Sequence, residues 1–195
     1  MAKTIFLLDN FDSFTYNLVD QFRSLGCDVR IYRNSLPAAQ IHAQIAACPN
    51  DPVLVLSPGP GAPHEAGCMI ELIGLCRGQV PILGICLGHQ AICEVYGGTI
   101  TYAKQLMHGK QSVATLKTDS PLFKGLPEQV DVGRYHSLAL DPDTLPEELE
   151  VLAHTEDGEI MAVGHKQYPV YGLQFHPESI LTPQGPMMVE NFLTL

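Results

Sequence analysis

Short apolar runs alternate with segments of helical apolar spacing throughout the first half of the chain. Thr4–Leu8 is an apolar run that predicts a strand, and Phe14–Leu25 carries apolar residues at helical spacing before Gly26. The same alternation predicts further strands at Val29–Tyr32, Val53–Leu56 and Val80–Ile85, and further helices at Pro37–Ala46, Ala66–Arg77 and Gly88–Tyr96. Four strand–helix units of this kind predict an α/β fold with a doubly wound, mostly parallel central sheet and helices on both faces.

The pattern changes after Gly98, where short strand candidates follow one another with only turns between them. These candidates are Thr99–Tyr102, Gln111–Leu116, Val130–Tyr135, Val151–Thr155, Ile160–Gly164 and Val170–Phe175. They predict a short antiparallel extension of the sheet, and Gly185–Leu193 predicts a last helix. No repeat, linker or low-complexity segment separates the two parts, so we expect one domain over residues 1–195.

Composition and charge narrow the classes of function. Of the 195 residues, 46% are apolar and 16% are charged, which is typical of a globular chain. The net charge of −10 repels phosphate backbones and anionic lipid, so we expect no nucleic-acid partner. No apolar run reaches the ~18 residues of a membrane-spanning helix, and Asp9 interrupts the apolar run that a signal peptide needs. We therefore expect a cytoplasmic protein with no membrane partner, whose six cysteines are mostly buried thiols.

A predicted buried strand ends in Gly84-Ile85-Cys86-Leu87-Gly88, and a predicted helix begins there. This Gly-x-Cys-x-Gly pattern is that of a nucleophile elbow with sulfur in place of oxygen. Glycines on both sides permit the tight turn, and the helix N-terminus favours the reactive thiolate. A cysteine taken alone is more often a packed apolar residue, but the elbow favours a nucleophile at Cys86.

A metal site is the other interpretation of this segment. Cys86, His89 and Cys93 stand at positions i, i+3 and i+7 and so share one face of the predicted helix. No fourth ligand stands at a familiar spacing, and Cys93 lies within an apolar run. We therefore expect no metal in this chain.

A thiol nucleophile needs a base, and the base needs a partner that orients it. His176 and Glu178 follow a predicted strand, and Pro177 stiffens the turn between them. We expect His176 to take the thiol proton and Glu178 to fix the tautomer, although such a pair taken alone is as often merely solvated. His136 also follows a predicted strand, but no acid stands near it in the sequence, so it ranks second as the base.

The glycine-rich loop Ser57–Pro63 follows the third predicted strand, at the edge of the sheet where doubly wound proteins bind ligands. Gly59 and Gly61 permit a close approach of the backbone to a substrate. A backbone amide of this loop and the amide of Leu87 are candidates for an oxyanion hole. A plain tight turn is the alternative interpretation of such a loop taken alone.

Three motifs, in this order, resemble those of the class I, or triad, glutamine amidotransferases: Ser57-Pro58-Gly59-Pro60-Gly61, Gly84-Ile85-Cys86-Leu87-Gly88-His89-Gln90 and Phe175-His176-Pro177-Glu178. The resemblance covers essentially the whole chain and implies a flavodoxin-like fold and glutaminase chemistry. It implies Cys86 as the nucleophile, His176 as base and acid, and Glu178 as the residue that orients His176. It also implies that the oxyanion donors and the glutamine pocket are formed by Gly59, Pro60, Gly61, Leu87, Gln90, Ser137 and Leu138.

Further segments are similar to those of the glutaminase subunits that serve chorismate-utilising synthases: Asp9–Asn17, Met107–Lys110, Arg134–Leu138 and Glu178–Thr182. Ser57–Pro63 and Glu65–Met69 favour component II of anthranilate synthase, which acts in tryptophan biosynthesis. The small subunit of aminodeoxychorismate synthase, or one chain shared by both synthases, is the alternative. A gamma-glutamyl hydrolase is a more distant alternative. A catalytically inactive module is disfavoured because all three triad positions are filled.

The resemblance also implies partners and a subunit organisation. The chain has no room before residue 4 or after Glu178 for the extra domains of other family members, so we expect a free-standing glutaminase subunit. Its substrate is then L-glutamine, and its partner is anthranilate synthase component I, the chorismate-utilising subunit. We expect no cofactor in this chain, and magnesium only in the partner. Phe11–Tyr16 and His108–Lys110 are the candidate docking segments, with an ordinary helix start and an ordinary turn as the alternatives.

Overall fold

Helices and strands alternate in the first half of the chain, and strands dominate the second half. The computed structural model describes residues 2–195. The helices are α1 (Thr15–Ser24), α2 (Ala38–Ala46), α3 (Met69–Cys76), α4 (Leu87–Val95) and α5 (Gly185–Phe192), with single 3₁₀ turns at Pro63–Glu65, Pro121–Phe123 and Pro142–Thr144. The strands are β1 (Thr4–Asp9), β2 (Asp28–Arg33), β3 (Pro52–Leu56), β4 (Ile82–Ile85), β5 (Ile100–Tyr102), β6 (Lys110–Leu116), β7 (Gln129–Arg134), β8 (Leu138–Leu140), β9 (Leu149–Thr155), β10 (Ile160–His165) and β11 (Val170–Leu173). Within residues 2–195, no helix is long and apolar enough to cross a membrane.

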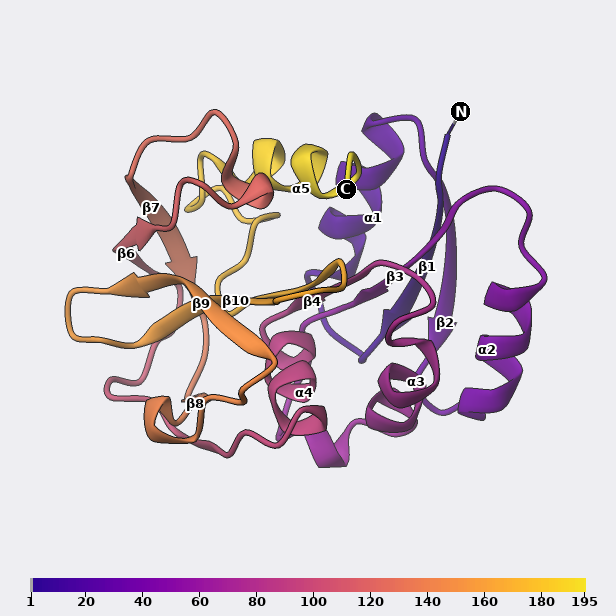
Figure 1. Ribbon diagram of the computed structural model, residues 1–195, viewed down its shortest axis with the longest axis horizontal. Helices are drawn as coiled ribbons and strands as arrows, with labels where there is room; N and C mark the ends of the chain where they lie inside the picture. The colour runs from indigo at the N-terminus through magenta and orange to yellow at the C-terminus, as the bar shows by residue number, and fades with distance from the viewer. Residues whose placement is uncertain (1) are drawn as a thin grey trace.

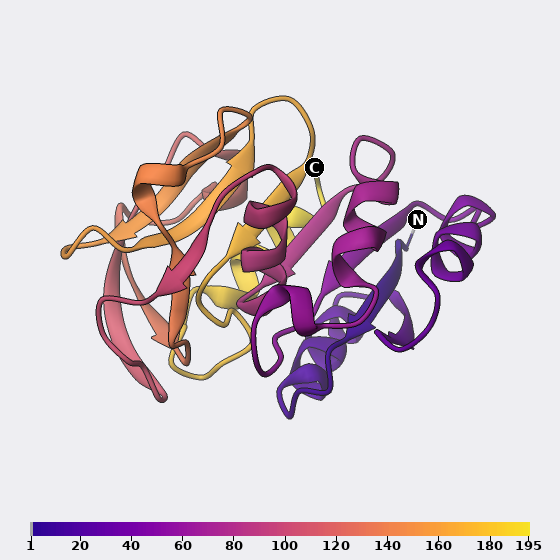
Figure 2. The same ribbon diagram turned by 90° about the horizontal axis from the view of Figure 1, so that it is seen from below.

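One mixed sheet of nine strands runs through the molecule in the order β2-β1-β3-β4-β11-β10-β9-β6-β7. Strands β2, β1, β3, β4 and β11 are parallel, and the remaining strands continue the sheet in antiparallel pairs. Figures 1 and 2 show the antiparallel part on the left and the parallel part on the right. This arrangement confirms the predicted parallel sheet with an antiparallel extension. Four of the six strand candidates after Gly98 form this extension, as β6, β7, β9 and β10.

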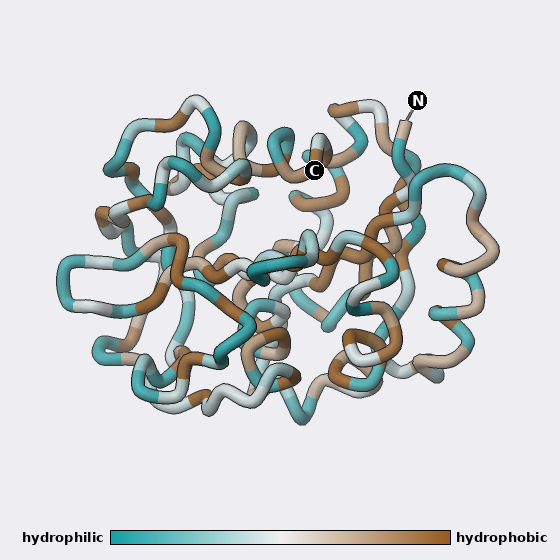
Figure 3. Tube along the Cα trace, viewed as in Figure 1, coloured by the Kyte–Doolittle hydropathy of each residue, from teal (hydrophilic) through white to brown (hydrophobic). Residues whose placement is uncertain are grey.

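Helices cover both faces of the parallel part, and each face has its own apolar core. In Figure 1, α1 and α5 lie above the sheet, α3 and α4 lie below it, and α2 lies to the right of β2. Successive residues of a strand point to opposite faces. Ile5 and Leu7 of β1 therefore belong to the core under α1 and α5, whereas Phe6 and Leu8 pack against the helices of the other face. Hydrophobic residues follow these central strands in Figure 3.

Strand β11 differs from its prediction in both pairing and length. The sequence predicts an antiparallel strand over Val170–Phe175, but β11 pairs in parallel with β4 on one side and antiparallel with β10 on the other. The chain leaves the sheet at Gln174, whose backbone N–H donates to the Met161 carbonyl at 2.8 Å. The residues that follow β11 are thereby brought to the end of β4.

Two smaller departures from the predicted elements concern strand β5 and helix α3. The predicted strand at Thr99–Tyr102 is confirmed as β5, but it lies outside the main sheet and pairs with β8, which the sequence does not predict. Helix α3 begins at Met69 instead of Ala66. Gly67 has a φ of +54°, which ends the preceding turn before the helix begins.

Candidate active site

Cys86 lies at the sharp turn between β4 and α4, as the predicted elbow requires. Its φ of +52° and ψ of −99° form a backbone conformation that residues other than glycine rarely adopt. Its N–H donates to the Leu173 carbonyl at 2.7 Å, which ties the turn to β11. A Cβ atom on Gly84 would lie 2.5 Å from the carbonyl carbon of Gly88, so the turn requires glycine there. The strained turn thus places Cys86 at the N-terminus of α4.

The predicted base and its orienting partner are in direct contact. His176 Nδ1 lies 2.5 Å from Glu178 Oε1, and the two side chains are 2% and 0% exposed. Burial disfavours the charged imidazolium, but the neighbouring Cys86 side chain and the Glu178 carboxylate favour it, and the pKa of His176 rises to about 10. His176 Nε2 has no hydrogen-bond partner among residues 2–195. This nitrogen is therefore available for proton exchange with the Cys86 sulfur, as in a triad of nucleophile, base and acid.

The loop that carries His176 is held by hydrogen bonds and aromatic rings. The His176 N–H donates to the Gly133 carbonyl at 3.1 Å, and Thr182 Oγ1 donates to the His176 carbonyl at 2.7 Å. The rings of Phe14 and Tyr135 pack edge-on against the imidazole, with centroids 5.2 and 4.8 Å away. These contacts restrict the imidazole to one position, which suits a general base.

His136, the second candidate for the base, lies at the site but is engaged elsewhere. Its Nε2 accepts a hydrogen bond from Arg134 Nε at 3.1 Å, and its Nδ1 lies 2.8 Å from the Leu138 carbonyl oxygen. Because arginine only donates, Nδ1 carries the ring proton and donates to Leu138. Burial, with the Arg134 charge, lowers the pKa of His136 to about 4. The structure therefore favours His176 as the base.

The glycine-rich loop lies directly against the elbow. A Cβ atom on Gly59 would lie 2.6 Å from Asn10 Cβ and 2.9 Å from Leu87 Cδ2, so only glycine fits between them. Asn10 anchors the loop, since its N–H donates to Ser57 Oγ and its Nδ2 to the Ser57 carbonyl, both at 2.9 Å. Leu87 is the first residue of α4, so its N–H has no acceptor within the helix. Gly59 and Leu87, whose amides are the predicted oxyanion donors, thus lie in contact, and Leu87 directly follows Cys86.

Cys86 borders a cavity of about 160 Å³. Its walls contain every residue predicted for the glutamine pocket and the oxyanion hole, together with Cys86 and two further residues. The lining residues are Gly59, Pro60, Gly61, Cys86, Leu87, Gln90, Tyr135, His136, Ser137 and Leu138. A larger cavity of about 420 Å³ beside Arg134 contains no member of the triad. The smaller cavity is therefore the candidate substrate site.

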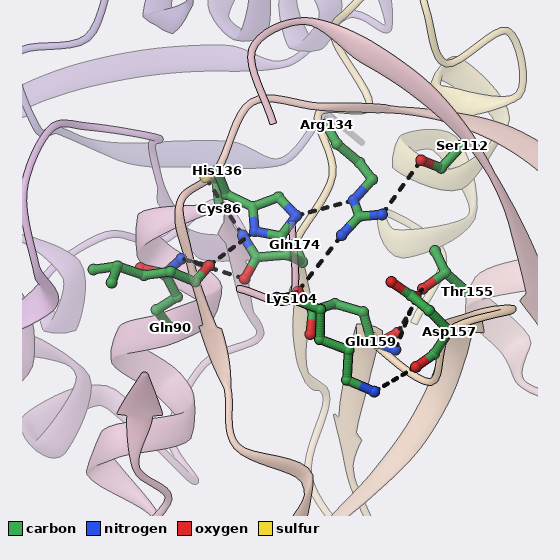
Figure 4. Close-up of polar contacts among 11 residues, drawn as sticks. Cys86, Gln90, Lys104, Ser112, Arg134, His136, Thr155, Asp157, Glu159 and Gln174 are labelled. Carbon is green, nitrogen blue, oxygen red and sulfur yellow. Dashed lines mark hydrogen bonds and ion pairs between the residues drawn. The ribbon is translucent and has the colours of Figure 1, made fainter. Parts of the chain in front are cut away.

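Two polar side chains beside this cavity escape prediction from the sequence (Figure 4). Gln174 is fully buried; its Nε2 donates to Cys86 Sγ at 3.5 Å, and its Oε1 accepts from Gln90 Nε2 at 3.3 Å. Arg134 is 2% exposed and contacts His136 on the other side. Gln174 directly follows the buried strand β11 and Arg134 ends β7, so each is a polar residue at a strand end, which is a weak signal in the sequence.

The side chains of the alternative metal site have different surroundings. Cys93 is fully buried in an apolar cluster with Leu140, and burial raises its pKa. His89 is fully buried, and burial lowers its pKa to about 3. Residues 2–195 hold no group of three His, Cys, Asp or Glu side chains placed to bind a metal ion. Cys93 and His89 thus belong to the packed interior, whereas Cys86 borders the cavity.

Comparison with known proteins shows the family. The family model for the class I glutamine amidotransferases matches residues 6–195. The chain therefore belongs to the class I glutamine amidotransferases. The elbow, the base and the cavity described above all lie within the matched residues.

Two individual relatives and one crystal structure are similar to this chain over nearly its whole length. Anthranilate synthase component 2 of Vibrio parahaemolyticus is 51% identical over 191 residues, which cover 98% of this chain and 94% of that protein. Aminodeoxychorismate synthase component 2 of Klebsiella aerogenes is 48% identical over 190 residues, which cover 97% and 98%. A crystal structure of a GMP synthase protein from Thermoplasma acidophilum has a TM-score of 0.83 at 27% identity and covers 100% of this chain and 94% of that one. These similarities confirm the predicted family and fold and the enzyme class of glutamine amidotransferase.

Proposed function

We propose that this chain is a glutaminase subunit that hydrolyses L-glutamine and delivers ammonia to a chorismate-utilising partner, anthranilate synthase component I, for tryptophan biosynthesis. The observation that carries the proposal is the buried contact between His176 and Glu178 beside Cys86. The adjoining cavity, lined by the residues predicted for glutamine, supports the substrate. Full-length similarity to an anthranilate synthase component 2 supports the pathway.

The reaction begins when the Cys86 sulfur attacks the side-chain carbonyl carbon of glutamine while His176 holds the thiol proton. The oxyanion accepts hydrogen bonds from the backbone amides of Gly59 and Leu87. The C–N bond then breaks as His176 gives its proton to the nitrogen, which leaves as ammonia and a thioester remains. Water gives a proton to His176 and attacks the thioester, and the proton returns to sulfur as glutamate leaves. Glu178 orients the imidazole and supports its positive charge throughout.

Ammonia serves a synthesis only when it reaches its acceptor unprotonated, because ammonium is not a nucleophile. A partner docked over the cavity provides that shelter. Large apolar side chains near the site are open to such a partner: Phe11 is 54% exposed, Tyr16 73% and Ile180 93%. Exposed apolar and aromatic side chains are typical of protein interfaces.

The two candidate docking segments lie next to the catalytic histidine. The Phe14 ring lies 5.0 Å from the Tyr135 ring, and a Cβ atom on Gly109 would lie 3.1 Å from the same tyrosine. Tyr135 in turn packs on His176. A partner that binds Phe11–Tyr16 and His108–Lys110 would therefore press on the residues that hold the base, which supports control of hydrolysis by the partner.

The chemistry requires no cofactor in this chain, because a thiol, an imidazole and backbone amides carry every step above. We assign magnesium to the chorismate-utilising partner alone. We also place the protein in the cytoplasm, a compartment where its six free cysteines stay reduced. The net charge of −10 supports the absence of nucleic-acid and lipid partners.

The second candidate function is the small subunit of aminodeoxychorismate synthase in folate biosynthesis. This chain is 48% identical to such a component, against 51% for the anthranilate component. These similar identities support the second candidate, and they equally support one chain that serves both synthases. A gamma-glutamyl hydrolase is disfavoured, because the residues predicted for free glutamine line the cavity.

The test is a steady-state glutaminase assay of the chain alone, with anthranilate synthase component I, and with its aminodeoxychorismate counterpart. We expect slow hydrolysis alone, since catalytic contacts of an isolated subunit often reach their productive geometry only when substrate and partner are bound. One misplaced donor costs about a hundredfold in rate, so component I should raise the rate by about that factor and anthranilate should form. Equal rates with and without partners would refute the coupling. Stimulation by the aminodeoxychorismate partner alone would select the second candidate.

A further inference from the structure

Buried polar contacts lead from the Cys86 sulfur across the wall of the cavity to His136 (Figure 4). Gln174 joins Cys86 to Gln90, and Gln90 Nε2 donates to the Leu138 carbonyl at 2.9 Å. The same carbonyl accepts from His136 Nδ1 at 2.8 Å. The Leu138 carbonyl is therefore held from two sides, by the Gln90 amide and by the His136 imidazole, and all three groups border the cavity.

Arg134 and Glu159 form the far end of these contacts. Arg134 Nε donates to His136 Nε2 at 3.1 Å, Nη1 donates to Ser112 Oγ at 3.3 Å, and Nη2 lies 3.5 Å from Glu159 Oε1. The two charged side chains are 2% and 3% exposed. Glu159 is held in turn by the backbone N–H of Lys104, at 3.3 Å from Oε1. Both charges are thus buried and paired, and the Arg134 guanidinium donates to one ring nitrogen of His136.

A buried ion pair adds little stability by itself, because the cost of desolvating two charges offsets their attraction. Its effect on His136 is specific, however. The guanidinium has donors only, so it binds the imidazole only when Nε2 is unprotonated, and the proton must then sit on Nδ1. If the proton were on Nε2 instead, this N–H would face the N–H donor of Arg134. The unprotonated Nδ1 could then no longer donate to the Leu138 carbonyl.

We propose that Arg134, with Glu159 as its counter-ion, is a positioning residue that holds His136 in the neutral Nδ1–H form and thereby fixes the Leu138 carbonyl and the Gln90 amide at the wall of the glutamine pocket. This inference rests on the proposed glutaminase function. Because Arg134 touches neither Cys86 nor His176, its effect falls on the binding of glutamine and not on the bond-breaking steps.

The test uses the double variant Arg134→Met with Glu159→Gln, which removes both charges and leaves neither one buried alone. We expect the KM for glutamine to rise roughly tenfold, the scale of one lost hydrogen bond, while kcat stays within about threefold. Arg134→Lys keeps a charge and a donor but loses the planar, forked guanidinium. Its KM should therefore lie between those of the wild type and the double variant. The matched control is Arg30→Met with Asp28→Asn, which removes an exposed ion pair of the same 3.5 Å separation and should leave KM unchanged.

Nitrogen NMR of the imidazoles gives a readout that needs no activity. The wild-type His136 should show a protonated Nδ1 and an unprotonated Nε2, and the double variant should show a mixture of tautomers. A merely structural ion pair would lower Tm without moving the tautomer or separating KM from kcat.

An unchanged tautomer, or an unchanged KM in a folded double variant, overturns the assignment of Arg134. If the double variant does not fold, Arg134→Lys decides, and a wild-type KM there overturns it equally. A wild-type chain that does not hydrolyse glutamine with any partner would instead refute the proposed function. The NMR signals of wild type and variants would then still show whether Arg134 sets the His136 tautomer, so the two failures are distinguishable.

Discussion

His176 and His136 are buried to nearly the same degree, 2% and 3% exposed, and they lie at the same site, yet they favour opposite charge states. Burial alone lowers the pKa of both. At His176 the Cys86 side chain and the Glu178 carboxylate outweigh burial and raise the pKa to about 10. At His136 the charge of Arg134 adds to the effect of burial, and the pKa falls to about 4.

The difference teaches that neighbouring groups, more than burial, assign each histidine its role. An imidazole between a thiol and a carboxylate holds a proton and passes it on, as a general base and acid must. An imidazole between a guanidinium and a carbonyl keeps one proton on Nδ1 and acts as a fixed hydrogen-bond donor. The direct test is therefore to replace the neighbours of each ring, while leaving the rings in place, and to ask whether the two histidines still differ in charge state.

Cys86→Ser removes one neighbour of His176 and has the largest expected effect. Glutamine-dependent synthesis should fall by roughly ten-thousandfold or more, because the nucleophile acts as a unit with its base. Synthesis from added ammonium salt by the assembled complex should persist. Cys27→Ser, at a half-buried thiol far from the elbow in sequence, is the control and should keep both activities. If Cys86→Ser retained the glutamine-dependent activity, the nucleophile would be misassigned.

Glu178→Gln removes the other neighbour, and its expected effect is smaller. The amide can still accept a hydrogen bond from Nδ1 but carries no charge, so the His176 pKa should fall. We expect folding to be intact and the glutaminase rate to drop by roughly a hundredfold to a thousandfold. Rates across pH, with the His176 signal followed by NMR, check both points. A wild-type rate would remove Glu178 from the triad, and a loss equal to that of Cys86→Ser would make it more than an orienting residue.

The arrangement of the proposed triad residues could be predicted because its signals are local in the sequence. Gly84, Cys86 and Gly88 mark a strand-to-helix turn that few sequences other than an elbow would need. His176 and Glu178 stand two positions apart on one loop, so their contact requires no knowledge of the fold. The alternation of strands and helices up to α4 is likewise local, and it predicts the parallel part of the sheet correctly.

The rest depends on contacts that no short pattern encodes. The parallel pairing of β11 with β4 joins segments that lie far apart in the sequence. The short strands next to β11 in the sequence are antiparallel, and for this reason the prediction assigned β11 to the antiparallel part. Strand β8 has three residues, too few for any periodicity. Gln174 contacts Cys86, which lies 88 positions away in the sequence, and Arg134 contacts Glu159, which lies 25 positions away. One polar residue in a buried strand signals that a partner exists but not which one.

The pH dependence of the two imidazoles sharpens the comparison directly. The pKa of His136 is lowered from 6.5 to about 4, so the unfolded chain binds its proton first as the pH falls. Stability from His136 is therefore complete above pH 6.5 and is lost below it, by about 2 kcal/mol at pH 5. His176, with its pKa raised to about 10, has the opposite sign: its contribution is complete below pH 6.5 and is lost as the pH rises toward 10.

Because the two contributions are lost on opposite sides of pH 6.5, together they favour greatest stability near that pH. The measurement is an NMR titration of each ring, accompanied by urea unfolding at several pH values. His136 should stay neutral down to about pH 5, and His176 should stay protonated up to about pH 9. Titration of His136 near its ordinary value of 6.5 would contradict the role assigned to Arg134 in the comparison.

Tyr135→Phe has the smallest expected effect and separates charge from packing at His176. The variant keeps the ring that packs edge-on against the imidazole at 4.8 Å and loses only the hydroxyl, which lies 2.9 Å from Ser179 Oγ. One such hydrogen bond contributes about 1 kcal/mol, so the free energy of unfolding should fall by about that amount. The His176 pKa should move by less than about half a unit, because the groups that raise it are Cys86 and Glu178. A larger shift would mean that the Tyr135 hydroxyl and its contact with Ser179, and not only the neighbouring thiol and carboxylate, set the charge state of the base.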